Sequence, residues 1–408
     1  MGQSPILGRE DSKIMSSIRE RLLEELSGKP VISTHSHHLP DIEQKKMTLE
    51  YMLENSYVSW CKEKPETAGR AVYLDRVRHK SYFRWLWQAL KDLYGFNEPL
   101  SEENWDEVSA AISRAYRNEL RHIDLMKNEC GYEKVILDAF WEPGSDNGYK
   151  GFFTPAFRIN MFMYGYDSEA VDYKGTNARR YYNMNITDID EYIYFIRERV
   201  IEKKAAGAVA LKCASAYDRG LDFTQTTKEK AQRAFRHRPD AGDIKAFQDY
   251  VYFRICEIAA ELDLPFQNHT GLGIIQKSNA MNLEEAIRKN PGTKFVLFHG
   301  SYPWMDDTFA LTHYYPNVYP DMCWLPIISE TAAKYFLNQI IEVSVSTKIC
   351  WGCDTRTSEE GYGALLAMRR ALSEVFAEKI ADGYLGFDEA AGFMDKIMYK
   401  NAKELYHI

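Results

Sequence analysis

The sequence predicts an α/β fold, a (β/α)8 TIM barrel with a helical insertion after its first strand. Eight short apolar runs recur along the chain, helical stretches separate most of them, and several late runs end in a polar or ionisable residue. Apolar strands that alternate with helices indicate a parallel sheet, and a barrel carries its active site at the carboxyl ends of the strands. We therefore expect functional side chains where these runs end.

Each apolar run is expected to form one strand of the barrel. The expected strands are 31–32, 134–138, 157–162, 208–212, 265–269, 294–299, 317–321 and 347–352. The expected helices outside the insertion are 12–27, 188–206, 243–262, 282–289, 329–342 and 361–380. These elements predict a single domain over residues 1–408, because no linker or repeat interrupts them.

Residues 45–130 differ from the rest of the chain in their sequence pattern. They are helical in pattern and rich in aromatic side chains, without alternating strands. Since the histidine-rich first strand precedes them, we expect this segment to be an insertion that caps the barrel mouth rather than a separate amino-terminal domain.

Composition excludes several classes of protein. The 408 residues contain 51 Lys+Arg and 59 Asp+Glu, a formal net charge of −8, whereas nucleic-acid binding requires clustered basic residues. No apolar run approaches the ~20 residues of a membrane span, and the charged first thirty residues lack the apolar core of a secretory signal. We therefore expect a cytoplasmic protein with a small-molecule substrate, no nucleic acid and no membrane; a homo-oligomer remains open.

The first expected strand leads into His35-Ser36-His37. In an extended strand, residues i and i+2 point the same way, so both imidazoles can reach one cation. Neutral imidazole suits Zn, Mn, Fe or Ni, and we expect Zn first. Alone, this pattern equally fits a solvent-facing histidine cluster. His269 at the end of a later strand, and Asp354 just beyond another, favour a metal site.

Three protein ligands, His35 and His37 with Asp354 or His269, leave a position open for water, which is typical of a catalytic site. The metal would lower the pKa of that water towards ~7. Asp354 could accept its proton and pass it to a leaving group. His299 could bind the metal or polarise the substrate. The alternative for each isolated histidine is a hydrogen-bonded residue at the barrel rim.

These motifs together resemble the amidohydrolase superfamily. Its pattern is an apolar strand leading to H-x-H, a Lys or Glu after strand four in binuclear members, His after strands five and six, and Asp after strand eight. The matching segments are residues 31–37, 266–271, 297–303 and 351–354, although Ser33 stands where the family usually has Asp.

The sequence is more similar to the amidohydrolase-related branch, which is also found fused to glutamine-synthetase-like domains. The residues that carry this similarity are 269–271, 299–303 and 315–321, with Lys212 followed by Tyr217, Arg219, Gly220 and Leu221. Asp354-Thr355-Arg356 is also distantly similar to the Asp-Ser-Arg of uronate isomerases. Residues 45–190 match neither pattern, and this leaves the substrate open.

Lys212 has three interpretations. The resemblance implies that it is carboxylated and bridges two metal ions, which makes it a metal ligand. A lysine at a strand end could equally bind a substrate carboxylate as a point charge, or form a structural ion pair. The number of ions, one or two, therefore stays open, and metal content would discriminate.

Substrate contacts are expected from residues near the barrel mouth. Arg356 suits a carboxylate, because its guanidinium binds two oxygens at once; a salt-bridged loop arginine is the alternative. Further candidates, for which packing is the alternative, are His38, Trp141, Tyr217, Arg219 and Tyr302.

We interpret the sequence as a metal-dependent hydrolase that cleaves an amide or ester bond of a small carboxylate-bearing substrate through a metal-activated water, with Asp354 and His299 as catalytic residues. The alternatives are a non-hydrolytic superfamily member, either a decarboxylase of an unsaturated or aromatic acid or a uronate-type isomerase, and a non-catalytic binding barrel.

Overall fold

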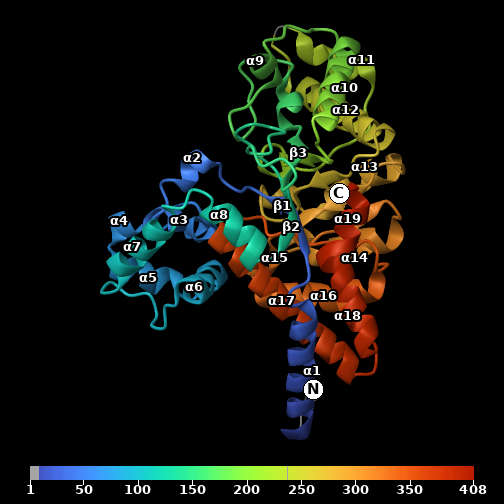
Figure 1. Ribbon diagram of the computed structural model, residues 1–408. Helices are drawn as coiled ribbons and strands as arrows, with labels where there is room; N and C mark the ends of the chain where they lie inside the picture. Colours follow the sequence, from blue (N-terminus) through green and yellow to red (C-terminus); the bar gives the residue numbers. More distant parts are fainter. Residues whose placement is uncertain (1–8, 237) are drawn as a thin grey trace.

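The computed structural model describes residues 9–236 and 238–408, and within them a parallel sheet forms the centre of the molecule (Figure 1). Its seven strands follow the chain order β1 to β7, and every neighbouring pair is parallel. The strands are β1 (Val31–Ser36), β2 (Tyr132–Leu137), β3 (Phe153–Arg158), β4 (Ala210–Cys213), β5 (Phe266–Asn268), β6 (Phe295–Leu297) and β7 (Val318–Pro320). The prediction of a parallel α/β sheet is confirmed.

The expected last strand, 347–352, is not a regular strand. It forms a parallel bridge between Asp321 and Cys350, and Cys350 N donates to Pro320 O at 3.0 Å. On its other side, Thr34 N donates to Trp351 O at 3.2 Å and Asp354 N to His35 O at 2.9 Å. This segment therefore contacts both β7 and β1.

The third strand was misplaced by the sequence pattern. It was expected at 157–162, but β3 ends at Arg158 and a 3-10 turn, Asn160–Tyr164, follows. The Asn160 side chain accepts a hydrogen bond from Ala214 N at 2.8 Å and donates to Asp218 at 2.7 Å. These contacts fix the turn, and apolar periodicity does not encode them.

Helices connect the strands and cover the sheet. Those outside the region between β1 and β2 are α1 (Arg9–Leu26), α9 (Ala178–Tyr182), α10 (Ile189–Ala205), α11 (Lys228–Gln232), α12 (Ala241–Glu261), α13 (Glu284–Lys289), α14 (Met305–Tyr314), α15 (Leu325–Ile328), α16 (Glu330–Val343), α17 (Ser358–Ala381), α18 (Phe387–Asp395) and α19 (Asn401–Tyr406). Asp188 caps α10 by accepting from Asp190 N and Glu191 N. None of the helices in the described residues is long and apolar enough to cross a membrane.

A group of helices separates β1 from β2 and lies beside the sheet (Figure 1). It consists of α2 (Asp41–Gln44), α3 (Leu49–Glu54), α4 (Pro65–Ala68), α5 (Arg70–Val77), α6 (Ser81–Tyr94), α7 (Trp105–Ala115) and α8 (Arg121–Asp124). The group has its own apolar cluster, which includes Leu74, Leu86 and Trp105.

Two buried glutamates at the start of α17 hold this helical group against that helix. Glu359 accepts hydrogen bonds from the hydroxyls of Tyr94 and Tyr116, both at 2.8 Å. Glu360 accepts from Tyr57 N at 2.6 Å. Buried carboxylates are stable only when hydrogen-bonded, so these contacts fix where Tyr57 lies.

Candidate metal centre

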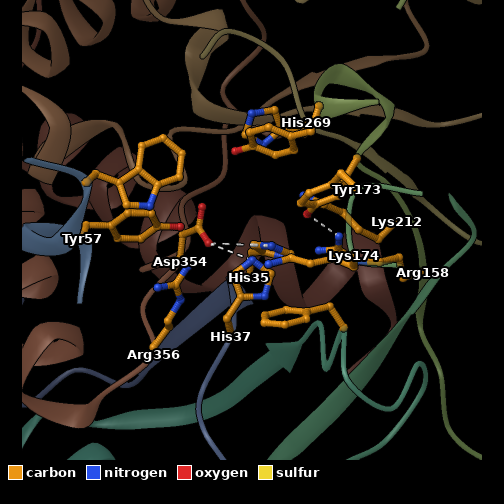
Figure 2. Close-up of a pocket in the computed structure, with 14 residues that line it drawn as sticks. His35, His37, Tyr57, Arg158, Tyr173, Lys174, Lys212, His269, Asp354 and Arg356 are labelled. Carbon is orange, nitrogen blue, oxygen red and sulfur yellow. Dashed lines mark hydrogen bonds and ion pairs between the residues drawn. The ribbon is translucent and has the colours of Figure 1, made fainter. Parts of the chain in front are cut away.

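The carboxyl ends of the strands surround a cavity of about 260 Å³ (Figure 2). Of the predicted site residues, seven line it: His35, His37, Lys212, Tyr217, His269, Asp354 and Arg356. This volume lies at the lower end of small-molecule sites, which span roughly 300–1,000 Å³. The cavity therefore suits a small substrate.

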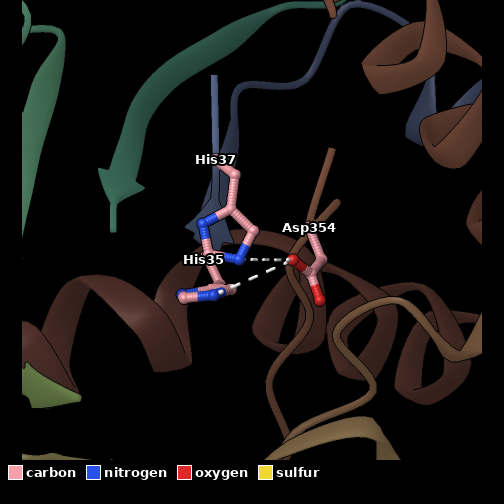
Figure 3. Close-up of side chains that lie close together, drawn as sticks. All are labelled: His35, His37 and Asp354. Atoms are coloured by element: carbon pink, nitrogen blue, oxygen red, sulfur yellow. Dashed lines mark ion pairs between the residues drawn. The ribbon is translucent and has the colours of Figure 1, made fainter. Parts of the chain in front are cut away.

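His35, His37 and Asp354 come together at one wall of this cavity (Figure 3). His35 belongs to β1 and His37 follows it by two residues, so both rings emerge on the same side of the chain. Oδ1 of Asp354 lies 3.8 Å from His35 Nε2 and 3.4 Å from His37 Nε2. One ligand atom from each residue lies within 4.8 Å of the others.

The chemistry of this group fits a divalent cation. Among the described residues, neither ring nitrogen of His35 nor Oδ1 of Asp354 has a hydrogen-bond partner, although all three atoms are buried. A buried polar atom without a partner costs about 1–3 kcal/mol, and a bound cation would remove that cost. Burial lowers the pKa of His35 well below its ordinary value and that of His37 to about 3. Both rings are therefore neutral at physiological pH, as metal ligands must be.

The hydrogen bond of His37 supports the same conclusion. Its Nδ1 lies 2.8 Å from the carbonyl oxygen of Asp138, so Nδ1 carries the proton and Nε2 presents its lone pair towards Asp354. A second ring nitrogen bonded to a backbone carbonyl is typical of metal-binding histidines.

His269 and His299 form a linked pair beside this group. His299 Nε2 lies 2.8 Å from His269 Nδ1, His269 Nε2 lies 2.6 Å from Leu272 O, and His299 Nδ1 lies 2.8 Å from Cys323 O. Three hydrogen bonds need three protons, whereas two neutral rings carry two. Since burial lowers the pKa of both rings, one of these contacts is weak in the neutral pair.

His299 also offers a second group of ligand atoms. Its Nδ1 lies 3.8 Å from Oδ2 of Asp354, and His299, Cys323 and Asp354 bring ligand atoms within 4.8 Å of one another. Asp354 belongs to both groups. Burial raises its pKa to about 7.

Lys212 lies in β4, one residue before the strand ends at Cys213, and is buried in the cavity wall. Its Nζ lies 4.0 Å from the centre of the Phe298 ring, and burial lowers its pKa to about 8. A lysine with such a pKa exists partly as the neutral amine near pH 8. Its roles as a metal bridge or as a substrate contact remain predictions.

The structure adds a buried ion pair that the sequence did not indicate as functional. Asp138 follows β2 and receives two hydrogen bonds from Arg158, at 3.0 and 2.5 Å. Its Oδ2 also lies 3.8 Å from His35 Nε2. Both residues end strands and are almost fully buried, which is unusual for charged side chains unless they are paired. The available signal was the position of Asp138 at the end of the expected strand 134–138; Arg158 gave none, because its strand was expected to begin at residue 157.

Four predicted substrate contacts do not line the cavity: His38, Trp141, Arg219 and Tyr302. His38 is buried with Nε2 2.8 Å from His122 Nδ1. Arg219 forms an ion pair with Asp249 at 2.8 Å. Trp141 packs at 5.0 Å against Phe140, which does line the cavity. Seven lining residues were not predicted: Tyr57, Trp60, Phe140, Arg158, Tyr173, Lys174 and Ala214.

Tyr57 comes from the helical group between β1 and β2. Its hydroxyl stabilises the charged form of Asp354 and so partly offsets the effect of burial on the pKa of that carboxyl. Its side chain is buried and stacks on Tyr82 at 5.6 Å. Tyr57 therefore positions the carboxylate that completes the candidate metal centre.

Replacing Tyr57 with Phe is expected to lower kcat about 10-fold, because it removes the hydroxyl that stabilises the Asp354 carboxylate, and a polar interaction with a charged group is worth about 1.5–3 kcal/mol. Steady-state kinetics on an amide substrate measure this. Tyr82→Phe is the matched control, because Tyr82 packs on the same ring but does not line the cavity. Equal activity in both variants would show that the Tyr57 hydroxyl has no such role.

Residues 196–408 match the amidohydrolase family model. This match covers just over half of the sequence, and the chain belongs to the amidohydrolase family. The family expected from the motifs is therefore confirmed.

An alignment of 222 positions with protein fluG of Emericella nidulans has 29% identity. It covers 49% of this chain and 26% of the fluG protein, so the chain matches about a quarter of the length of this curated relative.

Solved structures with the same fold cover nearly the whole chain. Glucuronate isomerase from Caulobacter crescentus has a TM-score of 0.77 and 15% identity, over 100% of this chain and 97% of that one. Uronate isomerase from Thermotoga maritima has a TM-score of 0.71 and 16% identity, over 99% and 100%. A Lactobacillus casei ATCC 334 protein, provisionally described as a metal-dependent hydrolase, has a TM-score of 0.69 and 17% identity, over 95% and 97%. At these identities the likeness shows the fold alone.

Proposed function

We propose that this protein is a metal-dependent hydrolase that cleaves an amide or ester bond in a small, carboxylate-bearing substrate. The observation that carries the proposal is the convergence of His35, His37 and Asp354 on one wall of the cavity, with buried atoms that lack hydrogen-bond partners. Membership of the amidohydrolase family supports it.

In this proposal His35, His37 and Asp354 hold the ion, and His269 is a further ligand. Lys212 joins these ligands if a second ion binds. Zinc is the first candidate, and Mn, Fe and Ni suit the same donors. A divalent ion there would activate water for attack and polarise the substrate carbonyl.

The residues of the chain supply the proton transfers and the orientation. Asp354 accepts a proton at its carboxylate and returns it to the leaving group. His299 does not line the cavity, and its two ring nitrogens contact Cys323 O and His269 Nδ1. It would therefore act on the developing negative charge through His269, which does line the cavity. Arg356 binds the substrate carboxylate, and Tyr217 packs beside His269, with ring centres 4.3 Å apart.

The proposal also assigns roles to two parts of the fold. Residues 349–354 take the place of the eighth strand and complete a barrel, since they contact both β7 and β1. The helical group between β1 and β2 caps the mouth of that barrel within a single domain, since it contributes Tyr57 and Trp60 to the cavity.

Hydrolysis is tested by assaying the purified protein, with Zn, Mn, Fe or Ni added, on N-acyl amino acids, γ-glutamyl amides and uronates. We expect amide cleavage that a chelator abolishes and metal restores. Turnover of uronates without amide cleavage would contradict the proposal and favour an isomerase, an activity that two proteins of the same fold carry in their names.

A further inference from the structure

The cavity carries an excess of positive charge. Four of its lining residues are cationic, Arg158, Lys174, Lys212 and Arg356, and one, Asp354, is a carboxylate. The lining histidines add no charge when they act as metal ligands, because imidazole binds a metal in its neutral form. Asp138, behind Arg158, is a carboxylate outside the lining that forms an ion pair with this set, and Glu360 accepts a hydrogen bond from the backbone N of Arg356 at 3.2 Å. Over the lining residues and Asp138, four cationic side chains face two carboxylates before any metal binds.

These excess charges belong to Lys174 and Arg356. Arg158 is neutralised by its two hydrogen bonds to Asp138, and Lys212 lies in the field of Asp138 and Asp354. By contrast, neither Lys174 nor Arg356 forms an ion pair with any carboxylate in residues 9–236 and 238–408. Nε of Arg356 is buried without a hydrogen-bond partner.

The two cations lie on different sides of the candidate metal centre. In Figure 2, Arg356 lies beside Asp354, whereas Lys174 lies with Arg158 and Lys212 on the other side of His35 and His37. Each rests against an aromatic ring, with Arg356 Cζ 5.5 Å from the centre of Tyr57 and Lys174 Nζ 4.2 Å from the centre of Phe140. A ligand that spans the centre would therefore meet one cation at each end.

The loop that carries Lys174 is fixed in place. The Asp172 carboxylate accepts hydrogen bonds from Lys174 N and Thr176 N, both at 2.9 Å. On the other side, Tyr173 OH accepts from Arg158 at 2.6 Å and Tyr173 N donates to Asp218 at 2.8 Å. An exposed lysine is often only a solvated surface group, but this loop holds Lys174 at the cavity. Preorganised cations bind anions at a lower entropic cost.

We propose that the substrate is a dianion of the dicarboxylate class, with one carboxylate bound by Arg356 and the second by Lys174. This inference rests on the proposed function only in placing the substrate in the same cavity. Lys174 thereby determines specificity for the second anionic group.

Isothermal titration calorimetry tests the inference with two probes, glutarate and 5-oxohexanoate. In 5-oxohexanoate an acetyl group replaces one of the two carboxylates of glutarate. The acetyl group is a ketone and cannot be hydrolysed. We expect the zinc-loaded protein to bind glutarate about 10-fold more tightly, and this preference to shrink at high salt. Lys174→Met is expected to remove most of the preference, and Lys174→Arg to retain it.

Lys127→Met is the matched control, because Lys127 also lies over a phenylalanine ring, Phe152 at 4.9 Å, but outside the cavity. Equal affinity for the two probes, no binding of either, or an unchanged preference in Lys174→Met would overturn the inference. Binding is measured without turnover, so the inference and the proposed reaction can fail separately. A preference for the dianion without amide cleavage would contradict the proposed reaction alone. Cleavage of monoanionic amides without any preference for the dianion would contradict this inference alone.

Discussion

Replacing Asp354 with Asn is expected to lower kcat/KM for amide hydrolysis by about 10³-fold, the range that loss of a proton-transfer group produces. Asn keeps the size of the side chain and tolerates the left-handed backbone at this position, where φ is 54°. The fold is therefore expected to persist, and the loss reports the carboxylate. Steady-state kinetics at saturating metal measure the effect, and circular dichroism checks the fold.

Asp321→Asn is the matched control for this experiment. Asp321 is also a buried carboxyl at a strand end, bonded to Thr34 Oγ1 at 2.7 Å and to Cys323 N at 2.8 Å, but it does not line the cavity. Activity within a few-fold of wild type is expected. If the two variants lost activity equally, the loss would reflect damage to buried carboxyls in general and not a role of Asp354.

Replacing Arg158 with Met is expected to lower the free energy of unfolding by about 3–5 kcal/mol, because it leaves Asp138 as an uncompensated buried charge. Burial raises the pKa of Asp138, but Arg158, His37 and Lys212 together outweigh this and hold the pKa below its ordinary value. Urea unfolding at pH 8 measures the loss of stability.

Two further measurements separate charge from packing in this pair. Adding Asp138→Asn to the Arg158→Met variant should recover part of the lost stability, since no buried charge then remains. In wild type, a carboxyl with a lowered pKa stabilises the fold above its unfolded-state pKa and loses that contribution as pH falls. Without Arg158 the pKa of Asp138 rises above its unfolded-state value. The loss of stability in Arg158→Met should therefore be smaller at pH 5 than at pH 8. A deficit independent of pH and of Asp138 would assign the effect to packing.

The sequence could predict the residues whose local pattern places them. His35 and His37 share a face because they are two residues apart in a strand, and Asp354 follows an apolar run. Helix α10 was predicted nearly to its ends, because Asp188 provides a strong amino-terminal cap. In such cases residues within a few positions of each other determine the local structure.

The sequence pattern did not predict the structure where contacts between residues far apart in the chain determine it. Arg158 was placed near the start of its strand, because an apolar run does not show where pairing ends, and the turn after it depends on contacts of Asn160 with Ala214 and Asp218. Tyr57 reaches the cavity only because Glu360, about 300 positions later in the chain, accepts a hydrogen bond from its backbone. Such pairings cannot be read from the spacing in one sequence.

Metal content tests the central claim most directly. The wild-type protein, purified without chelator, and the His35→Ala, His37→Ala and Asp354→Asn variants are loaded with zinc, dialysed and analysed by inductively coupled plasma mass spectrometry. We expect at least one equivalent of metal per wild-type chain and a large loss in each variant, since each removes one of few ligands. Wild-type protein that retains no metal, or three variants that retain as much as wild type, would contradict the account.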